Sequence, residues 1–190
     1  ILDEVATGFG RTGKMFAFEH YGVLPDLLTA GKGISSGFPL TAILGTSKVL
    51  DALEPGALSS THGGNPLACR SAVETIHILQ TERLVENAAA RGDELMAALK
   101  PLEQTSPIVG EVRGHGLMLG IEIVKDKDSR EPGKELATRI VEACMQRGLL
   151  LIKPIGFHGN VVRMAPPLTL TSEQAQIGAR IFSEAIRAVA

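Results

Sequence analysis

The chain has 190 residues, of which 44% are hydrophobic and 21% are charged. These proportions are typical of a globular protein with a hydrophobic core, and they exclude the collagen-like, disordered and membrane-spanning classes. A formal net charge of −2 excludes a basic surface for nucleic acid or an anionic membrane, so chemistry on a small molecule is the expected kind of function.

Three short apolar runs separated by glycine-rich turns lie in the first part of the chain. They predict strands of a mainly parallel sheet at Ile1–Val5, Leu27–Ala30 and Leu40–Leu44. Apolar residues at helical spacing then predict helices over Pro66–Leu79 and Leu84–Leu99, or one kinked helix across both. The first part of the chain is therefore expected to be α/β.

A passage between two domains is predicted at Pro101–Pro107, where two prolines flank polar residues. It divides the chain into residues 1–100 and a small α+β domain at residues 101–190. Apolar runs in the second domain predict strands at 109–112, 117–124, 149–152 and 161–164. An exposed charged loop is expected at 125–133, a helix over 135–147 that ends at Gly148, and a last amphipathic helix after an N-cap at Thr171.

Lys32 is the first residue that the pattern singles out for chemistry. It ends the apolar run Leu27–Ala30 and stands between two glycines. Ligands of open α/β sheets gather at the carboxyl ends of such strands. Asp3 lies in another apolar run, where an unpaired carboxylate would cost several kcal/mol, so it is expected to be buried beside a cationic partner.

The order and spacing of several short motifs resemble one family, the class III (omega-type) pyridoxal-phosphate-dependent aminotransferases, and within it the 4-aminobutyrate aminotransferase group. The motifs are Asp3-Glu4-Val5, Gly8–Gly13, Lys32, Ser60–Pro66, Gly159–Arg163 and Pro166–Thr169, and together they cover nearly the whole chain. The resemblance implies a fold-type I transferase, with residues 1–100 as the later part of the large domain and its connecting helix. Because the chain opens inside a predicted strand, it is expected to be an incomplete, carboxy-terminal part of such an enzyme.

Three residues would then contact the cofactor ring or its carbonyl carbon. The resemblance makes Lys32 the lysine that forms a Schiff base with pyridoxal phosphate, Asp3 the carboxylate that holds the proton of the pyridine nitrogen, and Val5 a residue that packs on the ring. Each has a plain structural alternative. Lys32 would be a solvated lysine at a strand end, Asp3 would pair with Arg11, and Val5 would belong to the core.

Two further residues are assigned by the same resemblance. Thr61 would bind the cofactor phosphate in the neighbouring subunit, which implies a homodimer, and Arg163 would bind a substrate carboxylate. The alternatives are helix capping by Ser60 or Thr61 and a buried structural ion pair for Arg163. His62 is expected to pack rather than to catalyse.

Two nucleotide-binding motifs are also present in outline. Gly8–Gly13 matches GxGxxG after a predicted strand, with Asp26 further on, which leaves a dinucleotide site open as an alternative. A phosphate-loop interpretation of Gly31-Lys32 fails, because Asp26 occupies the position of the required glycine and Gly33 that of the required Ser or Thr.

The substrate stays open at this point. Many family members carry glutamine after the Asp-Glu-Val motif, whereas this chain has Ala6. An omega-amino acid or amine as donor and a keto acid such as 2-oxoglutarate or pyruvate as acceptor are expected. The alternatives are an amino-acid racemase or epimerase with the same cofactor and a truncated, non-catalytic dimerising module. No metal is expected, and the two cysteines are expected to be reduced, as in a cytoplasmic protein.

Overall fold

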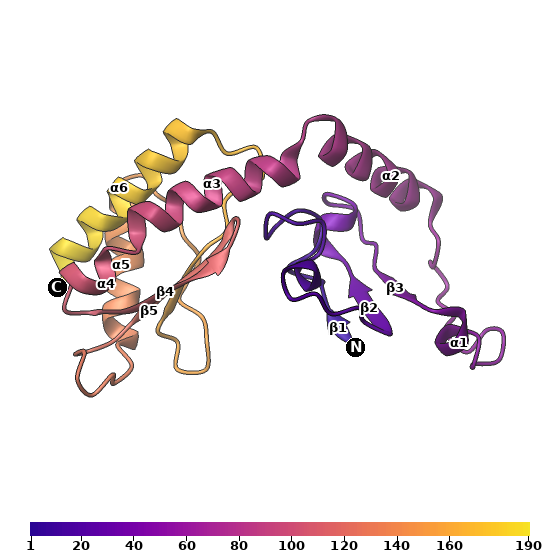
Figure 1. The fold of residues 1–190 in the computed structure, drawn as a ribbon, viewed down its shortest axis with the longest axis horizontal. Coiled ribbons are helices and arrows are strands. Elements are labelled where there is room, and N and C mark those ends of the chain that lie inside the picture. Colours follow the sequence, from indigo (N-terminus) through magenta and orange to yellow (C-terminus); the bar gives the residue numbers. More distant parts are fainter. The chain divides into compact units, whose positions relative to one another are not determined.

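The computed structural model describes all 190 residues, and they divide into two compact units (Figure 1). Unit 1 comprises Ile1–Glu86 and unit 2 comprises Asn87–Ala190. The division falls within helix α3 (Leu84–Leu99), and the domain boundary at residue 100 stays a prediction. None of the helices combines the length and the apolar composition that a membrane span requires.

Unit 1 contains a three-stranded sheet in the order β1 (Leu2–Asp3), β2 (Leu27–Ala30), β3 (Ala42–Gly45). Strands β1 and β2 are parallel, as predicted, but β3 runs antiparallel to β2. The short connection explains the difference: it holds only the 3-10 turn η2 (Lys32–Ile34), whereas a parallel return needs a crossover of about a dozen residues or more, usually a helix.

Helix α2 (Pro66–Thr81) covers part of this unit. The Ser71 hydroxyl donates to the Ser35 carbonyl at 2.7 Å and so ties α2 to the segment after η2. Two short helices, η1 (Ala17–His20) and α1 (Ser47–Leu50), complete the unit. Helices α2 and α3 are separate, because Arg83 between them adopts a left-handed conformation with φ of 53° that interrupts the helical path.

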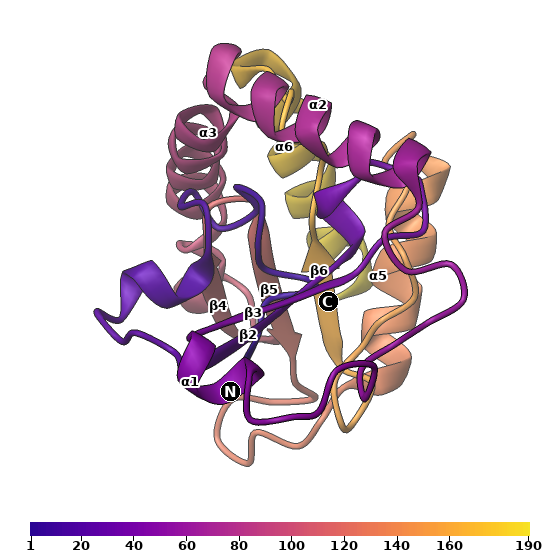
Figure 2. The same ribbon diagram turned by 90° about the vertical axis from the view of Figure 1, so that its right-hand side faces the viewer.

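Unit 2 is an antiparallel sheet covered on one face by helices, as Figure 2 shows. The strands β4 (Val109–His115), β5 (Met118–Ile123) and β6 (Val161–Met164) lie in chain order. Their alternate side chains form one core with α3 and with the remaining helices, which are α4 (Leu102–Thr105), α5 (Lys134–Gln146) and α6 (Ser172–Val189). The sheet therefore has one buried face and one more accessible face.

Helix ends in unit 2 follow the predicted chemistry. Gly148, directly after the C-cap of α5, has φ of 87°, and the Thr171 side chain accepts from the Gln174 amide at the start of α6.

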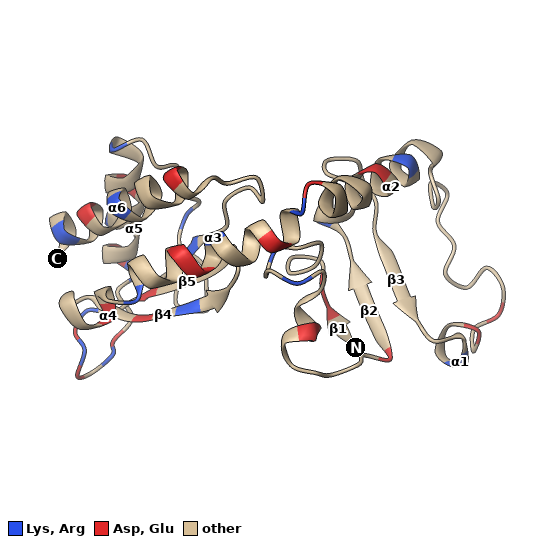
Figure 3. Cartoon of the chain, turned by 45° about the horizontal axis from the view of Figure 1, so that its top comes forward, with Lys and Arg blue, Asp and Glu red and all other residues tan.

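The predicted strand at 149–152 is wrong. Leu149 packs on the core and Leu150 is exposed, which is strand-like alternation, but no neighbouring strand pairs with this segment. Charged side chains of both signs are interspersed along the helices (Figure 3).

Candidate active site

The carboxyl ends of β1 and β2 bring together two of the predicted site residues. The two strands are parallel, and Asp3 lies opposite Thr29, so both strands leave the sheet at the same edge. Lys32 follows β2 after a single intervening glycine. Asp3 and Lys32 are therefore neighbours at the carboxyl edge, which is the position where open α/β sheets bind ligands.

Asp3 is exposed and is held by neutral donors. Its Oδ1 atom accepts from the Val5 amide at 2.9 Å and from the Thr29 hydroxyl at 3.2 Å. Its Oδ2 atom makes no hydrogen bond within the chain, so one carboxylate oxygen is oriented and available. The expectation of a buried Asp3 is wrong, because Asp3 is the last residue of β1 and lies at the open edge of the sheet.

Glu4 is the buried carboxylate of this motif, which the sequence analysis did not single out. Its Oε1 atom accepts from the Phe18 amide at 2.8 Å, its Oε2 atom accepts from the Thr7 hydroxyl, and only 2% of the residue is exposed. Side chains alternate between the two faces of a strand, so an outward Asp3 places Glu4 on the opposite, inward face. This alternation could have predicted the burial of Glu4 from the sequence. Glu4 thus fixes the loop that follows the strand bearing Asp3.

Val5 packs beside the backbone that leads to Lys32. A Cβ atom at Gly31 would lie 3.3 Å from Val5 Cγ1, which is closer than most side-chain contacts, and 3.4 Å from Thr41 Cγ2, which is at the limit of ordinary contact. The glycine before Lys32 therefore allows three segments to meet tightly at this edge. Val5 is half-buried here, so part of its side chain is available to a ligand.

Lys32 has an unusual backbone conformation. Its φ is 44°, in the left-handed region that non-glycine residues rarely occupy, and such strain clusters at functional sites. A hollow of about 480 Å³ lies beside it, lined by Lys32 and residues 37–41. The lysine is exposed and makes no hydrogen bond within the chain, so these residues alone do not desolvate the amine.

Thr61 lies in an exposed turn before α2. The cap of that helix is Asn65, whose side chain accepts from the Leu67 and Ala68 amides at 3.0 and 3.3 Å. The alternative in which Ser60 or Thr61 caps the helix is therefore wrong. No hydrogen bond joins Thr61 to Asp3 or Lys32.

Arg163 belongs to unit 2, on the more accessible face of β6. The neighbouring residues Val162 and Met164 point into the core, and Arg163 lies opposite Gly120 of β5. Its guanidinium makes no ion pair within the chain, and the alternative of a structural ion pair stays a prediction. A mainly apolar hollow of about 480 Å³ includes Arg163 in its lining, together with residues 148–152 and the first half of α6.

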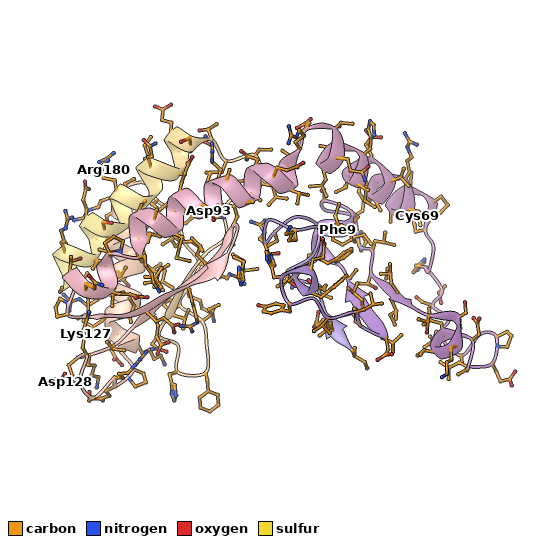
Figure 4. All side chains as sticks on the ribbon, in the orientation of Figure 1. Phe9, Cys69, Asp93, Lys127, Asp128 and Arg180 are labelled. Atoms are coloured by element: carbon orange, nitrogen blue, oxygen red, sulfur yellow. The ribbon has the colours of Figure 1, made fainter.

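The glycine motif at residues 8–13 does not open a helix. It forms consecutive turns in which Phe9, Gly10 and Gly13 have positive φ, and the next element is only the 3-10 turn η1. A dinucleotide site needs the strand, the glycine turn and a helix N-terminus in succession, so that alternative is wrong. The motif instead buries Phe9, which is labelled in Figure 4. Its ring packs edge-on against that of Phe16, with the ring centroids 5.4 Å apart.

The residues at the carboxyl edge fit pyridoxal phosphate. Asp3 offers one oriented carboxylate oxygen for a protonated ring nitrogen, Val5 offers an apolar surface, and Lys32 offers an amine without an internal partner. No cluster of His, Cys, Asp and Glu with the arrangement of a metal site occurs in the chain.

Comparison with known proteins identifies the family of the chain. The family model described as Aminotransferase class-III matches residues 1–186. The chain is 38% identical to a 5-aminovalerate aminotransferase of Pseudomonas aeruginosa and 40% identical to a 4-aminobutyrate aminotransferase of Escherichia coli, each over 97% of this chain and 43% of the relative. It is also 40% identical to an alanine/serine racemase of Pyrococcus horikoshii, over 98% of this chain and 39% of that protein.

A solved transaminase from the marine bacterium Virgibacillus superposes with a TM-score of 0.90 at 34% identity, over 99% of this chain and 45% of that one. The fold is therefore the α/β fold of the fold-type I transferases. The chain spans less than half the length of these relatives. With a family model that matches almost every residue, the chain belongs to the class III aminotransferases, a family that uses pyridoxal phosphate.

Proposed function

We propose that the protein is a pyridoxal-phosphate-dependent aminotransferase that moves an amino group from an omega-amino acid or amine to a keto acid such as 2-oxoglutarate or pyruvate. The observation that carries this proposal is the placement of Asp3 and Lys32 at the same edge of two adjacent parallel strands. The donors named for two relatives, 5-aminovalerate and 4-aminobutyrate, support the omega-amino class.

Each predicted site residue has a distinct task in this proposal. The cofactor, when bound, supplies an electron sink for the charge left when a substrate carbon loses its proton. Asp3 keeps the ring nitrogen protonated through Oδ2, while Val5 supports the ring. Lys32 binds the cofactor and then moves the proton between substrate carbons as a base and an acid. Arg163 orients a substrate carboxylate through its planar set of donors.

The proposal includes a homodimer in which Thr61 of one subunit binds the phosphate in its neighbour's site. The Thr61 hydroxyl is exposed and has no capping task, which supports a role toward another subunit. A cytoplasmic location is also proposed. Cys69 and Cys144 are both free thiols, as expected in a reducing compartment.

The test is covalent labelling of the full-length protein that carries this chain. The protein is incubated with pyridoxal phosphate, reduced with borohydride and digested, and the pyridoxyl label is mapped by peptide mass. We expect selective label on Lys32 and none in Lys32→Ala, together with an aldehyde product from 4-aminobutyrate or 5-aminovalerate, formed with a keto acid as the amino acceptor, only in the unsubstituted enzyme. Label scattered over surface lysines, or normal turnover by Lys32→Ala, would overturn the assignment.

A second candidate is a racemase that uses the same residues, and the racemase from Pyrococcus horikoshii favours it. Both reactions begin when Lys32 removes a proton from the substrate carbon, and they differ in where the proton returns. Incubation of the full-length protein with single enantiomers of alanine separates them. A racemase gives the other enantiomer without consuming a keto acid, whereas an aminotransferase consumes the added keto acid and forms an equal amount of pyruvate from alanine.

A further inference from the structure

Thr29 is the residue of β2 that lies directly opposite Asp3 of β1. Its hydroxyl donates to Asp3 Oδ1 at 3.2 Å, and its backbone carbonyl accepts from the Glu4 amide at 2.9 Å. The hydroxyl makes no other hydrogen bond within the chain. Thr29 therefore joins β2 to both acids of the motif, to Asp3 through its side chain and to Glu4 through its backbone.

The two hydrogen bonds that Asp3 Oδ1 accepts differ in what they fix. The Val5 amide belongs to the same segment, two residues further on, and such a local bond holds the carboxylate only relative to its own backbone. The Thr29 hydroxyl comes from the neighbouring strand, 26 residues away in sequence. Because β2 leads directly to Lys32, this hydroxyl is the contact that relates the carboxylate to the strand preceding the lysine.

Threonine in a strand also has a plain structural explanation, because β-branched residues favour strands. Valine satisfies that preference with nearly the same shape, but it has no donor. Thr29 is half-buried and Asp3 is exposed, so in the ligand-free protein water can replace a lost hydroxyl at the carboxylate. A ligand that covers Asp3 excludes this water, so the hydroxyl matters most in the complex.

We propose that Thr29 is a positioning residue for the cofactor ring and acts through Asp3. Its hydroxyl and the Val5 amide occupy Oδ1, which leaves Oδ2 to accept from the protonated ring nitrogen. The hydroxyl also holds the carboxylate at a fixed position relative to the strand that leads to Lys32. The role of Thr29 rests on the proposed function for the task of Asp3.

The test uses the full-length protein, freed of cofactor, and pyridoxine phosphate as the probe. This compound has the ring and the phosphate of the cofactor but no aldehyde, so it forms no covalent bond to Lys32. With ¹⁵N in its ring, the NMR shift of the bound probe reports whether the ring nitrogen is protonated. A titration with the same probe gives the dissociation constant, and neither readout depends on turnover.

Two substitutions at position 29 separate the hydroxyl from the shape of the side chain. Thr29→Val removes the donor, and we expect it to raise the dissociation constant about fivefold, which is the scale of one hydrogen bond. It should also shift the bound ring nitrogen toward its neutral form. Thr29→Ser keeps the donor and should match the unsubstituted protein in both readouts. Thermal unfolding without ligand should give the opposite order, because valine suits a strand better than serine.

The dependence on Asp3 is measured in an Asp3→Ala background. If Thr29 acts through the carboxylate, adding Thr29→Val to Asp3→Ala changes the dissociation constant by less than about twofold. A further loss as large as that of Thr29→Val alone would show that Thr29 acts independently of Asp3 and would overturn the inference.

The remaining outcomes separate this role from the proposed reaction. An unchanged ring-nitrogen shift in Thr29→Val, or equal losses in Thr29→Val and Thr29→Ser, would overturn the role of Thr29 and leave amino transfer in place. If the ring nitrogen responds as expected but the full-length protein transfers no amino group to a keto acid, the role of Thr29 stands and the proposed reaction is wrong. A neutral ring nitrogen in the unsubstituted complex would overturn the tasks of both Asp3 and Thr29.

Discussion

The Phe18 amide donates to Glu4 Oε1 at 2.8 Å, which closes a loop of fourteen residues onto the end of β1. The same carboxylate accepts from Thr7, and the Glu4 carbonyl accepts from the Gly8 amide at 2.9 Å. One buried side chain thus positions the segment directly after Asp3. The adjacent acids have separate tasks: Glu4 holds the loop, and Asp3 presents an oxygen to the edge of the sheet.

Replacement of the buried carboxylate of Glu4 is expected to lower the free energy of unfolding. Glu4→Ala leaves the Phe18 amide without an acceptor, which costs about 1–3 kcal/mol in the free energy of unfolding. Glu19→Ala is the matched control, because Glu19 accepts from the Phe16 amide at an exposed position and water replaces it there. Chemical denaturation of both variants measures the difference. Equal losses would show that burial of Glu4 has no energetic consequence.

The positive φ of Lys32 predicts that a glycine variant at this position is more stable than an alanine variant, which is the reverse of the usual order. Lys32→Ala keeps a Cβ atom in the left-handed region, where it costs about 1–2 kcal/mol, whereas Lys32→Gly releases that strain. Glycine also loses more entropy on folding, so we expect the glycine variant to be more stable by roughly 0.5–1 kcal/mol.

The control for Lys32 is the same pair of substitutions at Lys48, inside helix α1. There the order should reverse, because glycine in a helix costs about 1 kcal/mol relative to alanine. Denaturant unfolding of the four variants decides the question. An alanine variant at position 32 that equals or exceeds the glycine variant would refute the strained conformation.

Asn65 and Thr61 are close in sequence, but their substitutions are expected to change different properties, namely stability for Asn65 and cofactor binding for Thr61. Asn65→Ala removes the cap of α2 and should lower the free energy of unfolding by about 1 kcal/mol. Thr61→Ala should leave the stability of the cofactor-free protein unchanged and weaken pyridoxal-phosphate binding by the full-length protein. Thermal unfolding without cofactor and a cofactor titration separate the two effects. Loss of stability in cofactor-free Thr61→Ala would mean that its hydroxyl is structural.

Asn160 is the polar residue in the motif that leads to Arg163, and its hydrogen bonds explain why it is there. Its side-chain amide donates to the Ile123 carbonyl at 2.8 Å, and its backbone carbonyl accepts from the Ile123 amide at 2.8 Å. Asn160→Ala removes one of two donors to the buried Ile123 carbonyl, which keeps the Gly133 amide at 3.0 Å, so we expect a loss of about 0.5–1.5 kcal/mol in the free energy of unfolding. Asn160→Asp should lose more at pH 7, because two acceptors face each other there, and should recover as the pH is lowered. An aspartate variant as stable as the unsubstituted protein would contradict this role.

Local patterns in the sequence were sufficient for several parts of this structure. Strands β2 and β6 and helix α3 begin and end where the apolar runs predict, because their burial is encoded in successive residues. The left-handed cap at Gly148 and the N-cap at Thr171 also follow from local chemistry. These features need no information from distant residues.

The local sequence patterns did not show which segments pair with one another as strands of a sheet. Residues 149–152 alternate like a strand, but a strand exists only where a neighbouring backbone supplies hydrogen bonds. The direction of β3 and the exposure of Asp3 likewise depend on the sheet edge rather than on the apolar run. The site residues were named by resemblance. The oriented oxygen of Asp3 and the strain at Lys32 became visible only in three dimensions.

Cys144 predicts how stability changes in alkaline solution. It is fully buried, and desolvation raises its pKa to about 11. The unfolded thiol loses its proton at a lower pH, near its ordinary value, so the folded state binds more protons between those two values. This contribution to stability is therefore fully present below about pH 9 and is lost as the pH rises through 11, by about 3 kcal/mol in total.

Cys144→Ala is the comparison that isolates this effect, because alanine does not titrate. The variant should be less stable at pH 7 owing to lost packing, yet the gap between the two proteins should narrow steadily from pH 9 to 11. Urea unfolding at fixed pH values measures the gap, and contributions that the two proteins share cancel in the difference. A constant gap across this range would show that the thiol titrates alike in the folded and unfolded states, and burial would then have no effect on its proton.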